Sequence, residues 1–305
     1  MRRIGVIVLA GVLLVVAGCV AGTGQPTTVG PASPAVARST TTTIEVGDRP
    51  VLLHVPASRP VGVPAALVVV LHGYTGEAEG AVEFFGLRQL ADQRGFLVAA
   101  PQGTTDSEGK TFWNASNACC NFGGSTVDDS GYLSRVIATA VSTQGVDPAR
   151  VYVVGHSNGG FMAHRLACEH ADQVSAIASL AGALDAEADC TPARPVSVVQ
   201  IHGTADDTIR YGGGAIEGRP YTSAAGTVGL WRRADGCRSD GRTGQRLDAD
   251  ANVAGDDLRA TTWTTCREDT EVALWSITDG SHSPALTPAF TAALFDWFEA
   301  HRRTR

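Results

Sequence analysis

The stretch VYVVGHSNGGFMAHRLA, residues 151–167, decides the fold. It begins as a continuous apolar run, which is typical of a strand buried on both faces of a parallel sheet. It then passes through Gly155, Ser157 and Gly159 into a helical pattern. Functional sites of parallel α/β sheets lie beyond the carboxyl ends of the strands. The pattern therefore predicts that a tight turn holds the Ser157 hydroxyl at such an end.

The spacing G-x-S-x-G between a strand and a helix is the nucleophile-elbow motif of α/β-hydrolases. Gly155, Gly159 and Gly160 remove side chains where the strand and the helix must approach closely. The backbone N–H of Asn158 then faces a developing oxyanion, and the start of the helix adds positive potential there. Ser157 is therefore the candidate nucleophile.

The rest of the chain repeats the alternation of apolar strands and amphipathic helices, which predicts a mostly parallel sheet with helices on both faces. A hairpin at 41–46 and 51–55 is expected to add an antiparallel edge, and the segment 182–195 is too short for a large cap domain. The fold class is thus α/β, of the α/β-hydrolase type. We expect strands at 66–73, 96–103, 150–155, 174–180, 196–202 and 271–277, and helices at about 80–94, 128–143, 158–170, 223–234 and 287–302.

A serine hydroxyl needs a base and an orienting acid, which follow the serine in the order Asp, His in this fold. The strand in VVQIHGTADDTIRY (198–211) leads to Asp206 and Asp207, and spacing alone does not choose between them. VALWSITDGSHSP (272–284) places His282 in a Gly/Ser loop before the final helix. These residues are the candidate acid and base.

The other histidines are weaker candidates for the base. His301 lies in the charged terminal helix, and His164 and His170 lie on the helix after the elbow, away from the strand ends. His156 and His202 flank motifs, and we expect structural roles for them.

A second oxyanion donor is expected from LHGYTG (71–76), where Gly73 permits a tight turn and presents the N–H of Tyr74. A plain glycine turn is the alternative. One such donor can stabilise a transition state by about 3 kcal/mol.

The N-terminus has the layout of an export signal. Arg2 and Arg3 precede a short apolar run and the small residues before Cys19, so residues 1–18 are predicted to be a signal peptide. The segment before Cys19 also resembles the lipobox of bacterial lipoproteins, in which the cysteine is lipidated; an ordinary cleaved signal is the alternative. Residues 19–40 are rich in Gly, Thr, Pro and Ser and indicate a flexible tether. Residues 41–305 would form the catalytic domain.

Export implies an oxidising compartment, and six cysteines remain after Cys19. We favour the disulfides Cys168–Cys190 and Cys237–Cys266, which close modest loops, and this leaves Cys119 and Cys120 paired with each other or reduced. The sequence has no CxxC pair and no His at ligand spacing, so no metal site is predicted.

The composition limits the partners. The formal net charge is −7 and no basic stripe is present, which disfavours nucleic-acid binding. The hydrophobic fraction is 44%, enough for a sizeable core in a chain of 305 residues.

With these motifs in place, the chain resembles the secreted esterases that include short-chain polyhydroxybutyrate depolymerases and the feruloyl esterases of carbohydrate esterase family 1. The resemblance implies that Asp206, in HGTAD, is the acid of the triad. It also matches the paired Cys119 and Cys120 after a tryptophan. Many members continue the histidine with Thr-Trp-Pro-Gly, whereas Ser-Pro-Ala follows here. The matching segments, in family order, are LHGYTG (71–76), WNA…CC (113–120), VDDSGYL (127–133), GHSNGG (155–160), HGTADDTIRY (202–211), the cysteines at 237 and 266, and DGSH (279–282).

The expected activity is hydrolysis of carboxylic esters through an acyl-enzyme, without a cofactor. Trp113, Tyr211 and Tyr221 are the aromatic candidates for substrate contact, with loop anchoring as the alternative for each. The substrate would be a short-chain, feruloyl, acetyl or polyhydroxyalkanoate ester, polymeric or plant-derived. An envelope acyltransferase and a non-catalytic binding lipoprotein are the alternative functions. We expect an exported protein that is lipid-anchored to the outer face of the membrane or secreted.

Overall fold

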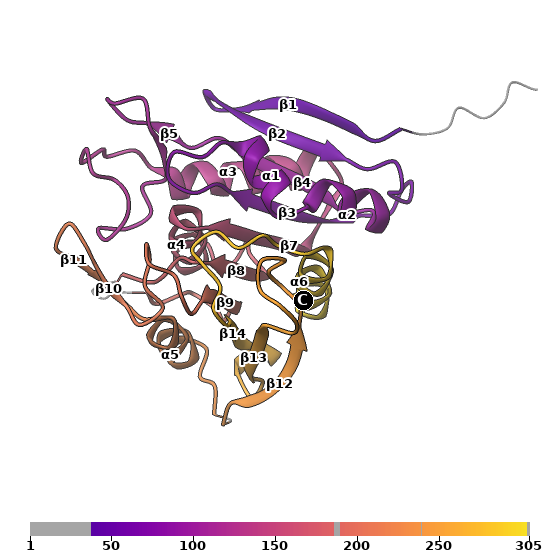
Figure 1. Cartoon of the computed structure of the whole chain (residues 1–305). Helices are drawn as coiled ribbons and strands as arrows, with labels where there is room; N and C mark the ends of the chain where they lie inside the picture. The colour runs from indigo at the N-terminus through magenta and orange to yellow at the C-terminus, as the bar shows by residue number, and fades with distance from the viewer. Residues whose placement is uncertain (1–37, 186–189, 239, 304–305) are drawn as a thin grey trace, which may run out of the picture. The chain divides into compact units, whose positions relative to one another are not determined.

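The computed structural model describes residues 38–185, 190–238 and 240–303, all within the unit Ala37–Arg305. The predicted signal peptide, most of the tether and Cys19 lie outside the described residues. The main sheet of the described part has ten strands (Figure 1). In spatial order they are β1 (Thr40–Val46), β2 (Arg49–Val55), β4 (Leu97–Pro101), β3 (Ala65–Leu71), β7 (Val146–His156), β8 (Ala176–Leu180), β9 (Ser197–Gly203), β14 (Val272–Ile277), β13 (Leu258–Trp263) and β12 (Arg242–Leu247).

The six central strands of the sheet are parallel. Every residue of β3, β4, β8 and β9 is buried and most are apolar, as expected for strands covered on both faces. The predicted hairpin forms one antiparallel edge, with β1 beginning at Thr40. β13 and β12 form the other edge, again antiparallel. This second edge was not predicted, because its strands, RTGQRL and LRATTW, are polar and lack a clear apolar alternation.

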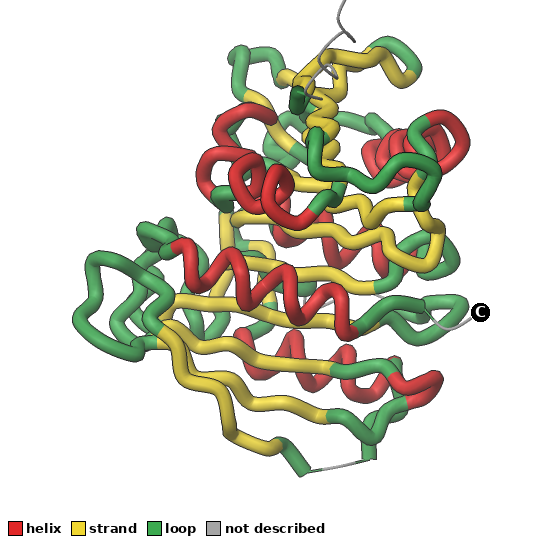
Figure 2. Tube along the Cα trace, turned by 90° about the vertical axis from the view of Figure 1, so that its right-hand side faces the viewer, coloured by secondary structure: helices red, strands yellow, loops and turns green. Residues whose placement is uncertain are grey.

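Helices pack on both faces of the sheet, and Figure 2 shows them lying along the strands. Val68 and Val70 face one core with α1, α2 and α6, whereas Leu67 and Val69 face a second core with α3, α4 and α5. The predicted α/β-hydrolase fold is therefore confirmed. The helices are α1 (Ala78–Phe84), α2 (Leu87–Arg94), α3 (Asp129–Thr143), α4 (Asn158–Glu169), α5 (Ala224–Ala234) and α6 (Pro288–Ala300), and two small hairpins, β5 (Thr104–Thr105) with β6 (Thr111–Phe112) and β10 (Gly214–Ile216) with β11 (Arg219–Tyr221), lie in the loops.

The helix predicted at 80–94 is two helices. Gly86 lies between α1 and α2 with a φ of 62°, in the left-handed region that favours glycine, and this breaks the helix. The turn separates α1, which reaches the functional site, from α2, which packs on α6.

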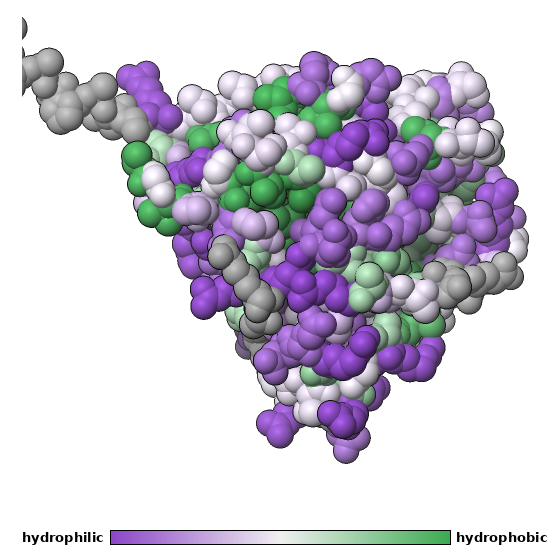
Figure 3. Space-filling model, turned by 180° about the vertical axis from the view of Figure 1, so that it is seen from behind, coloured by the Kyte–Doolittle hydropathy of each residue, from purple (hydrophilic) through white to green (hydrophobic). Residues whose placement is uncertain are grey.

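Three disulfides are present in the described residues: Cys168–Cys190, Cys237–Cys266 and Cys119–Cys120. The first two are the pairings favoured from loop length, and the third joins the adjacent cysteines. The face of the protein shown in Figure 3 mixes hydrophilic residues with small groups of apolar ones. None of the helices that the structure describes has both the length and the apolar character of a membrane-spanning helix.

Candidate active site

The turn between β7 and α4 has the strained geometry of a nucleophile elbow. Ser157 has φ 54° and ψ −119°, a conformation that non-glycine residues rarely adopt. A Cβ atom on Gly155 would lie 2.1 Å from the Gly159 carbonyl oxygen, and one on Gly159 would lie 2.3 Å from that of Leu71. Only glycine fits at these positions. The Ser157 N–H donates to the Leu180 carbonyl at 2.8 Å, which ties the elbow to the next strand.

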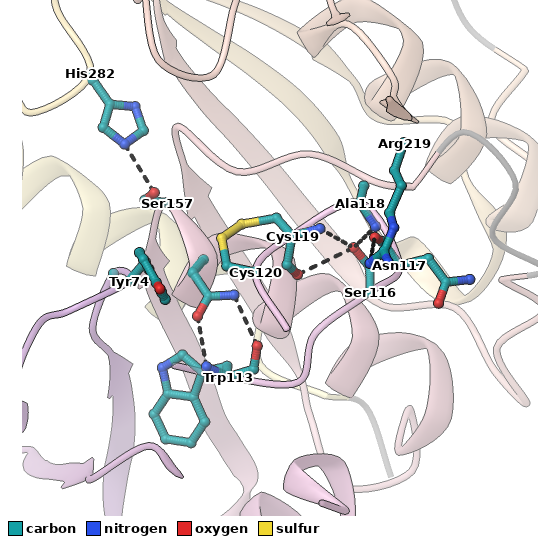
Figure 4. The surroundings of a disulfide bond; sticks show 12 residues. Tyr74, Trp113, Ser116, Asn117, Ala118, Cys119, Cys120, Ser157, Arg219 and His282 are labelled. Carbon is teal, nitrogen blue, oxygen red and sulfur yellow. Dashed lines mark hydrogen bonds between the residues drawn. A yellow bond between two sulfur atoms is a disulfide. The ribbon is translucent and has the colours of Figure 1, made fainter. Parts of the chain in front are cut away.

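Three loops bring the predicted triad residues together. The His282 ring, in the loop after β14, has Nε2 2.9 Å from the Ser157 Oγ and Nδ1 2.8 Å from Asp206 Oδ2 (Figure 4 shows the first contact). Asp206 lies in the loop after β9 and its side chain is fully buried. Asp207, the other acid that spacing allowed, is exposed and does not contact His282.

Asp206 accepts hydrogen bonds on both oxygens. Oδ1 accepts the N–H groups of Thr208 and Ile209, each at 2.9 Å, and Oδ2 is 3.3 Å from the Nε2 of His202 as well as bonded to His282. Burial acts to raise the pKa of Asp206, but the hydrogen bonds from His202 and His282 outweigh it and hold the pKa well below its usual range. Asp206 is therefore a carboxylate that can orient and stabilise a protonated His282.

The turn after β3 is braced so that one N–H is left free. The Gly73 carbonyl accepts from the His72 Nδ1 at 2.8 Å and from the Gly76 N–H at 3.0 Å. In a trans peptide the N–H points opposite to the C=O, so these two donors turn the Tyr74 N–H away from themselves. Within the described residues, neither the Tyr74 N–H nor the Asn158 N–H has a hydrogen-bond partner. Two backbone donors are thus unpaired beside Ser157.

His72 is fixed from its other side as well. Its Nε2 accepts the Gly103 N–H at 2.9 Å, which leaves the proton on Nδ1 for the Gly73 carbonyl. Burial is the main cause that lowers the pKa of His72, so the ring keeps this single-proton form. This role of His72 was not predicted, although His72 directly precedes the glycine of the turn.

Trp113 joins the elbow to the same turn. Its backbone N–H donates to the Asn158 Oδ1 at 2.7 Å and its carbonyl accepts from the Asn158 Nδ2 at 3.0 Å. Figure 4 draws both hydrogen bonds as dashed lines at the Trp113 backbone. Its indole N–H donates to the His72 carbonyl at 3.0 Å. The Trp113 side chain is fully buried, so this residue anchors the loop.

The other two predicted substrate contacts are also bonded within the fold. Tyr221 is buried and its hydroxyl accepts the Arg210 N–H at 2.9 Å, while the Tyr211 hydroxyl is 2.7 Å from the Ser276 Oγ. None of Trp113, Tyr211 and Tyr221 lines the pocket next to Ser157. An aromatic side chain in a loop is consistent with substrate contact and with loop anchoring, and only its packing in the structure distinguishes these roles.

A pocket of about 360 Å³ opens beside Ser157 toward α1. Its wall is more apolar than polar, because Phe84 and Ala81 of α1 face it together with glycine backbone. Phe84 was not among the substrate contacts predicted from the sequence. The lining residues are His72, Gly73, Tyr74, Thr75, Gly76, Glu77, Gly80, Ala81, Phe84, His156, Ser157, His282 and Ser283.

The residues that the structure describes include no group of three or more His, Cys, Asp or Glu side chains that could hold a metal ion. The Cys119–Cys120 disulfide, drawn in Figure 4, belongs to the same buried apolar cluster as Trp113 and Tyr132.

Comparison of the amino-acid sequence with known protein families supports the same fold. The family model of the alpha/beta hydrolase fold matches residues 66–269. A protein of Nocardia uniformis subsp. tsuyamanensis with a provisional esterase name, NocK, is 34% identical over 66% of this chain and 62% of its own length. Feruloyl esterase B of Piromyces equi is 27% identical over 77% of this chain and 42% of its own length. This chain thus spans less than two thirds of either relative.

Other curated relatives are named poly(3-hydroxyalkanoate) depolymerase and acetylxylan esterase. Among solved structures, an acetyl xylan esterase from Aspergillus awamori superposes with a TM-score of 0.61, at 18% identity, over 85% of this chain and 99% of that one. At this identity the likeness concerns the fold. The family match covers more than half of the chain, and the chain therefore belongs to the α/β-hydrolase family.

Proposed function

We propose that this protein is a serine esterase that hydrolyses short-chain carboxylic esters through an acyl-enzyme. The observation that carries the proposal is the hydrogen-bonded line from the Ser157 Oγ through His282 to the buried Asp206. A hydroxyl with a base on one side, and a carboxylate behind that base, has the arrangement that activates serine nucleophiles.

In the acylation step the Ser157 Oγ attacks the ester carbonyl carbon while the His282 Nε2 takes the hydroxyl proton. Asp206 accepts the Nδ1 hydrogen bond, holds the ring in this tautomer and stabilises the imidazolium. The C–O bond of the ester then breaks, and His282 gives its proton to the departing alkoxide. The products are the free alcohol and an ester of Ser157.

Water completes the cycle by the reverse proton path. The water oxygen attacks the acyl carbon while His282 takes a proton from the water. His282 then returns that proton to the Ser157 Oγ as the carboxylic acid leaves. The unpaired N–H groups of Tyr74 and Asn158 would bind the oxyanion in both steps. Each such donor contributes about 3 kcal/mol to transition-state stabilisation.

The pocket supports a small, mostly apolar acyl group. Its volume of about 360 Å³ and its wall of Phe84, Ala81 and glycine backbone fit a short aliphatic chain better than a charged group. The names of the relatives, which include feruloyl, acetylxylan and poly(3-hydroxyalkanoate) esters, agree with ester substrates in general.

A panel of nitrophenyl esters and natural esters tests the proposal. We expect turnover of acetyl and butyryl esters by the parent protein, and a loss of several orders of magnitude in Ser157→Ala with an unchanged circular dichroism spectrum. Unchanged turnover in this variant would identify another nucleophile. Product analysis with an added alcohol separates hydrolysis from acyl transfer, because transfer would yield a new ester.

We also propose that the protein is exported and anchored by a lipid on Cys19, with residues 1–18 as signal, 19–40 as tether and 41–305 as catalytic domain. The three disulfides support an oxidising compartment. Cys19→Ala should move the protein from the membrane fraction to the soluble fraction of the producing cell. Equal distribution of the two forms would contradict the anchor.

A further inference from the structure

Behind Asp206, a line of buried polar side chains crosses from α5 to β9. The Trp231 Nε1 lies 3.0 Å from the Nδ1 of His164 on α4, and the His164 Nε2 lies 2.9 Å from the Oε1 of Gln200 on β9. The Gln200 Nε2 lies 3.2 Å from the Nδ1 of His202. The His202 Nε2 faces Asp206 Oδ2 at 3.3 Å.

The donor in each contact is determined by the two groups at the ends of the line, each of which can only donate or only accept a hydrogen bond. An indole N–H can only donate and a carboxylate can only accept, so Trp231 and Asp206 determine the direction at the two ends of the line. His164 must accept on Nδ1 and donate from Nε2. Gln200 then accepts on Oε1 and donates from Nε2.

Two backbone carbonyls impose the same direction independently. The Gly182 carbonyl oxygen is 2.8 Å from the Gln200 Nε2, so that atom must be the amide nitrogen. The Ile209 carbonyl oxygen is 2.6 Å from the His202 Nε2, so that ring nitrogen must carry the proton. Only one set of tautomers and one amide orientation satisfies all of these contacts.

We propose that Trp231, His164, Gln200 and His202 are positioning residues for the esterase reaction, which act by holding the His202 N–H so that it faces the carboxylate of Asp206 as well as the Ile209 carbonyl. This inference rests on the proposed function. None of the four side chains lines the pocket beside Ser157, so each acts through Asp206 and His282.

The burial of the line supports this role. All four side chains have at most 1% of their surface exposed, and an unpaired polar group there would be costly. Burial lowers the pKa of His164 to about 4, so this ring is neutral at assay pH and has the one donor and one acceptor that the line needs. The titratable groups that face Asp206 are His202 and His282, and the Tyr211 ring lies edge-on to His202.

The line has a predictable electrostatic effect. The His202 N–H is shared between the Ile209 carbonyl at 2.6 Å and Asp206 Oδ2 at 3.3 Å. It takes up part of the negative charge of Asp206, which would otherwise attract the proton of His282 more strongly. When the direction of the line is lost, the carboxylate of Asp206 should hold the imidazolium of His282 more strongly. The acid limb of the pH profile of kcat/KM reports this change, because His282 must be unprotonated to act as the base.

Gln200→Met tests the proposal, because methionine has a similar size and cannot fix His202. We expect kcat/KM to fall about tenfold, with KM little changed, and the acid limb to move to higher pH by roughly half a unit. Trp231→Phe removes only the indole N–H at the start of the line, and the acid limb of kcat/KM should move in the same direction by a smaller amount. This second variant keeps the test valid if Gln200→Met does not fold.

Thr227→Val is the matched control. Thr227 is also buried on α5 and bonds to the Leu184 N–H and the Thr222 hydroxyl, with no path to Asp206. This variant should lose thermal stability but keep the parent pH profile. If Gln200→Met and Trp231→Phe fold and also keep that profile, or if Thr227→Val shifts it equally, the proposal is wrong. Ser157→Ala, assayed alongside, shows separately whether the proposed esterase reaction itself fails.

Discussion

The imidazole of His156 donates a hydrogen bond from Nε2 to the backbone carbonyl of His282 over 2.9 Å. The residue before the nucleophile therefore holds the loop that carries the base, although 126 positions separate the two residues in sequence. Burial lowers the pKa of His156 to about 4, so the ring stays neutral near physiological pH.

Loss of this hydrogen bond should affect catalysis more than substrate binding. His156→Phe keeps a ring against Phe84, whose centroid lies 4.8 Å from that of His156, but it removes the donor. We expect kcat to fall about tenfold with little change in KM, the effect of one misaligned hydrogen bond. Steady-state kinetics measure this. His156→Gln retains an N–H and should recover part of the loss; equal activity of all three forms would contradict the role.

Trp113→Phe separates anchoring from substrate binding. Phenylalanine keeps the ring but lacks the indole N–H that bonds to the His72 carbonyl at 3.0 Å. The turn that presents the Tyr74 N–H should become less ordered, so we expect kcat to fall several-fold to about tenfold for acetyl and feruloyl esters alike. A rise in KM confined to the feruloyl ester would instead indicate direct stacking on the substrate.

The pocket beside α1 should set the acyl length. Gly80 lines the pocket, and a Cβ atom added there meets no atom within 4 Å. A leucine at this position should enter the open space, lower kcat/KM for octanoyl esters and spare acetyl esters. Gly80→Ala is the control: it should leave the acyl preference unchanged and stabilise α1 by about 1 kcal/mol. Equal loss for all chain lengths in Gly80→Leu would place the acyl group elsewhere.

Asp235 should make the stability depend on pH. This carboxyl is fully buried, its Oδ2 has no hydrogen-bond partner in the described part of the chain, and burial raises its pKa to about 7. The folded state therefore keeps a proton that the unfolded state releases above about pH 4, so stability falls as the pH rises through about 7. The free energy of unfolding in urea should drop by roughly 4 kcal/mol between about pH 4 and about pH 8 through this group, since about three pKa units at about 1.36 kcal/mol each separate the folded and unfolded states.

Asp235→Asn should remove that dependence, since the amide does not titrate. The exposed Asp256 provides a control, because Asp256→Asn should keep the parental pH dependence. If the parent and Asp235→Asn have parallel stability curves across this range, Asp235 is not the cause.

Much of this site could be predicted because its chemistry lies at strand ends. Apolar strands that run into Gly155, Gly203 and the loop before His282 mark the three places where an α/β sheet presents side chains. The choice of Asp206 over Asp207 needed the family resemblance, since adjacent residues in a loop differ only in how the loop turns.

The supporting side chains could not be predicted in the same way. His164 was predicted to lie away from the strand ends, yet its ring contacts Gln200 on β9. Helical spacing gives the face of a residue on its own helix but not its distance from a strand of the sheet. Trp113 appeared in a loop, where an aromatic residue can either stack on a substrate or anchor the chain. Such roles depend on contacts between residues far apart in sequence, which local patterns do not encode.

Trapping the covalent intermediate tests the central claim most directly. Acid quenching of the protein during turnover of nitrophenyl acetate, followed by peptide mass spectrometry, should find one acetyl group on the peptide that contains Ser157. His282→Ala should strongly reduce the rate at which it forms. Turnover that leaves Ser157 unmodified, or an acetyl group at another residue that forms at the rate of turnover, would contradict the account.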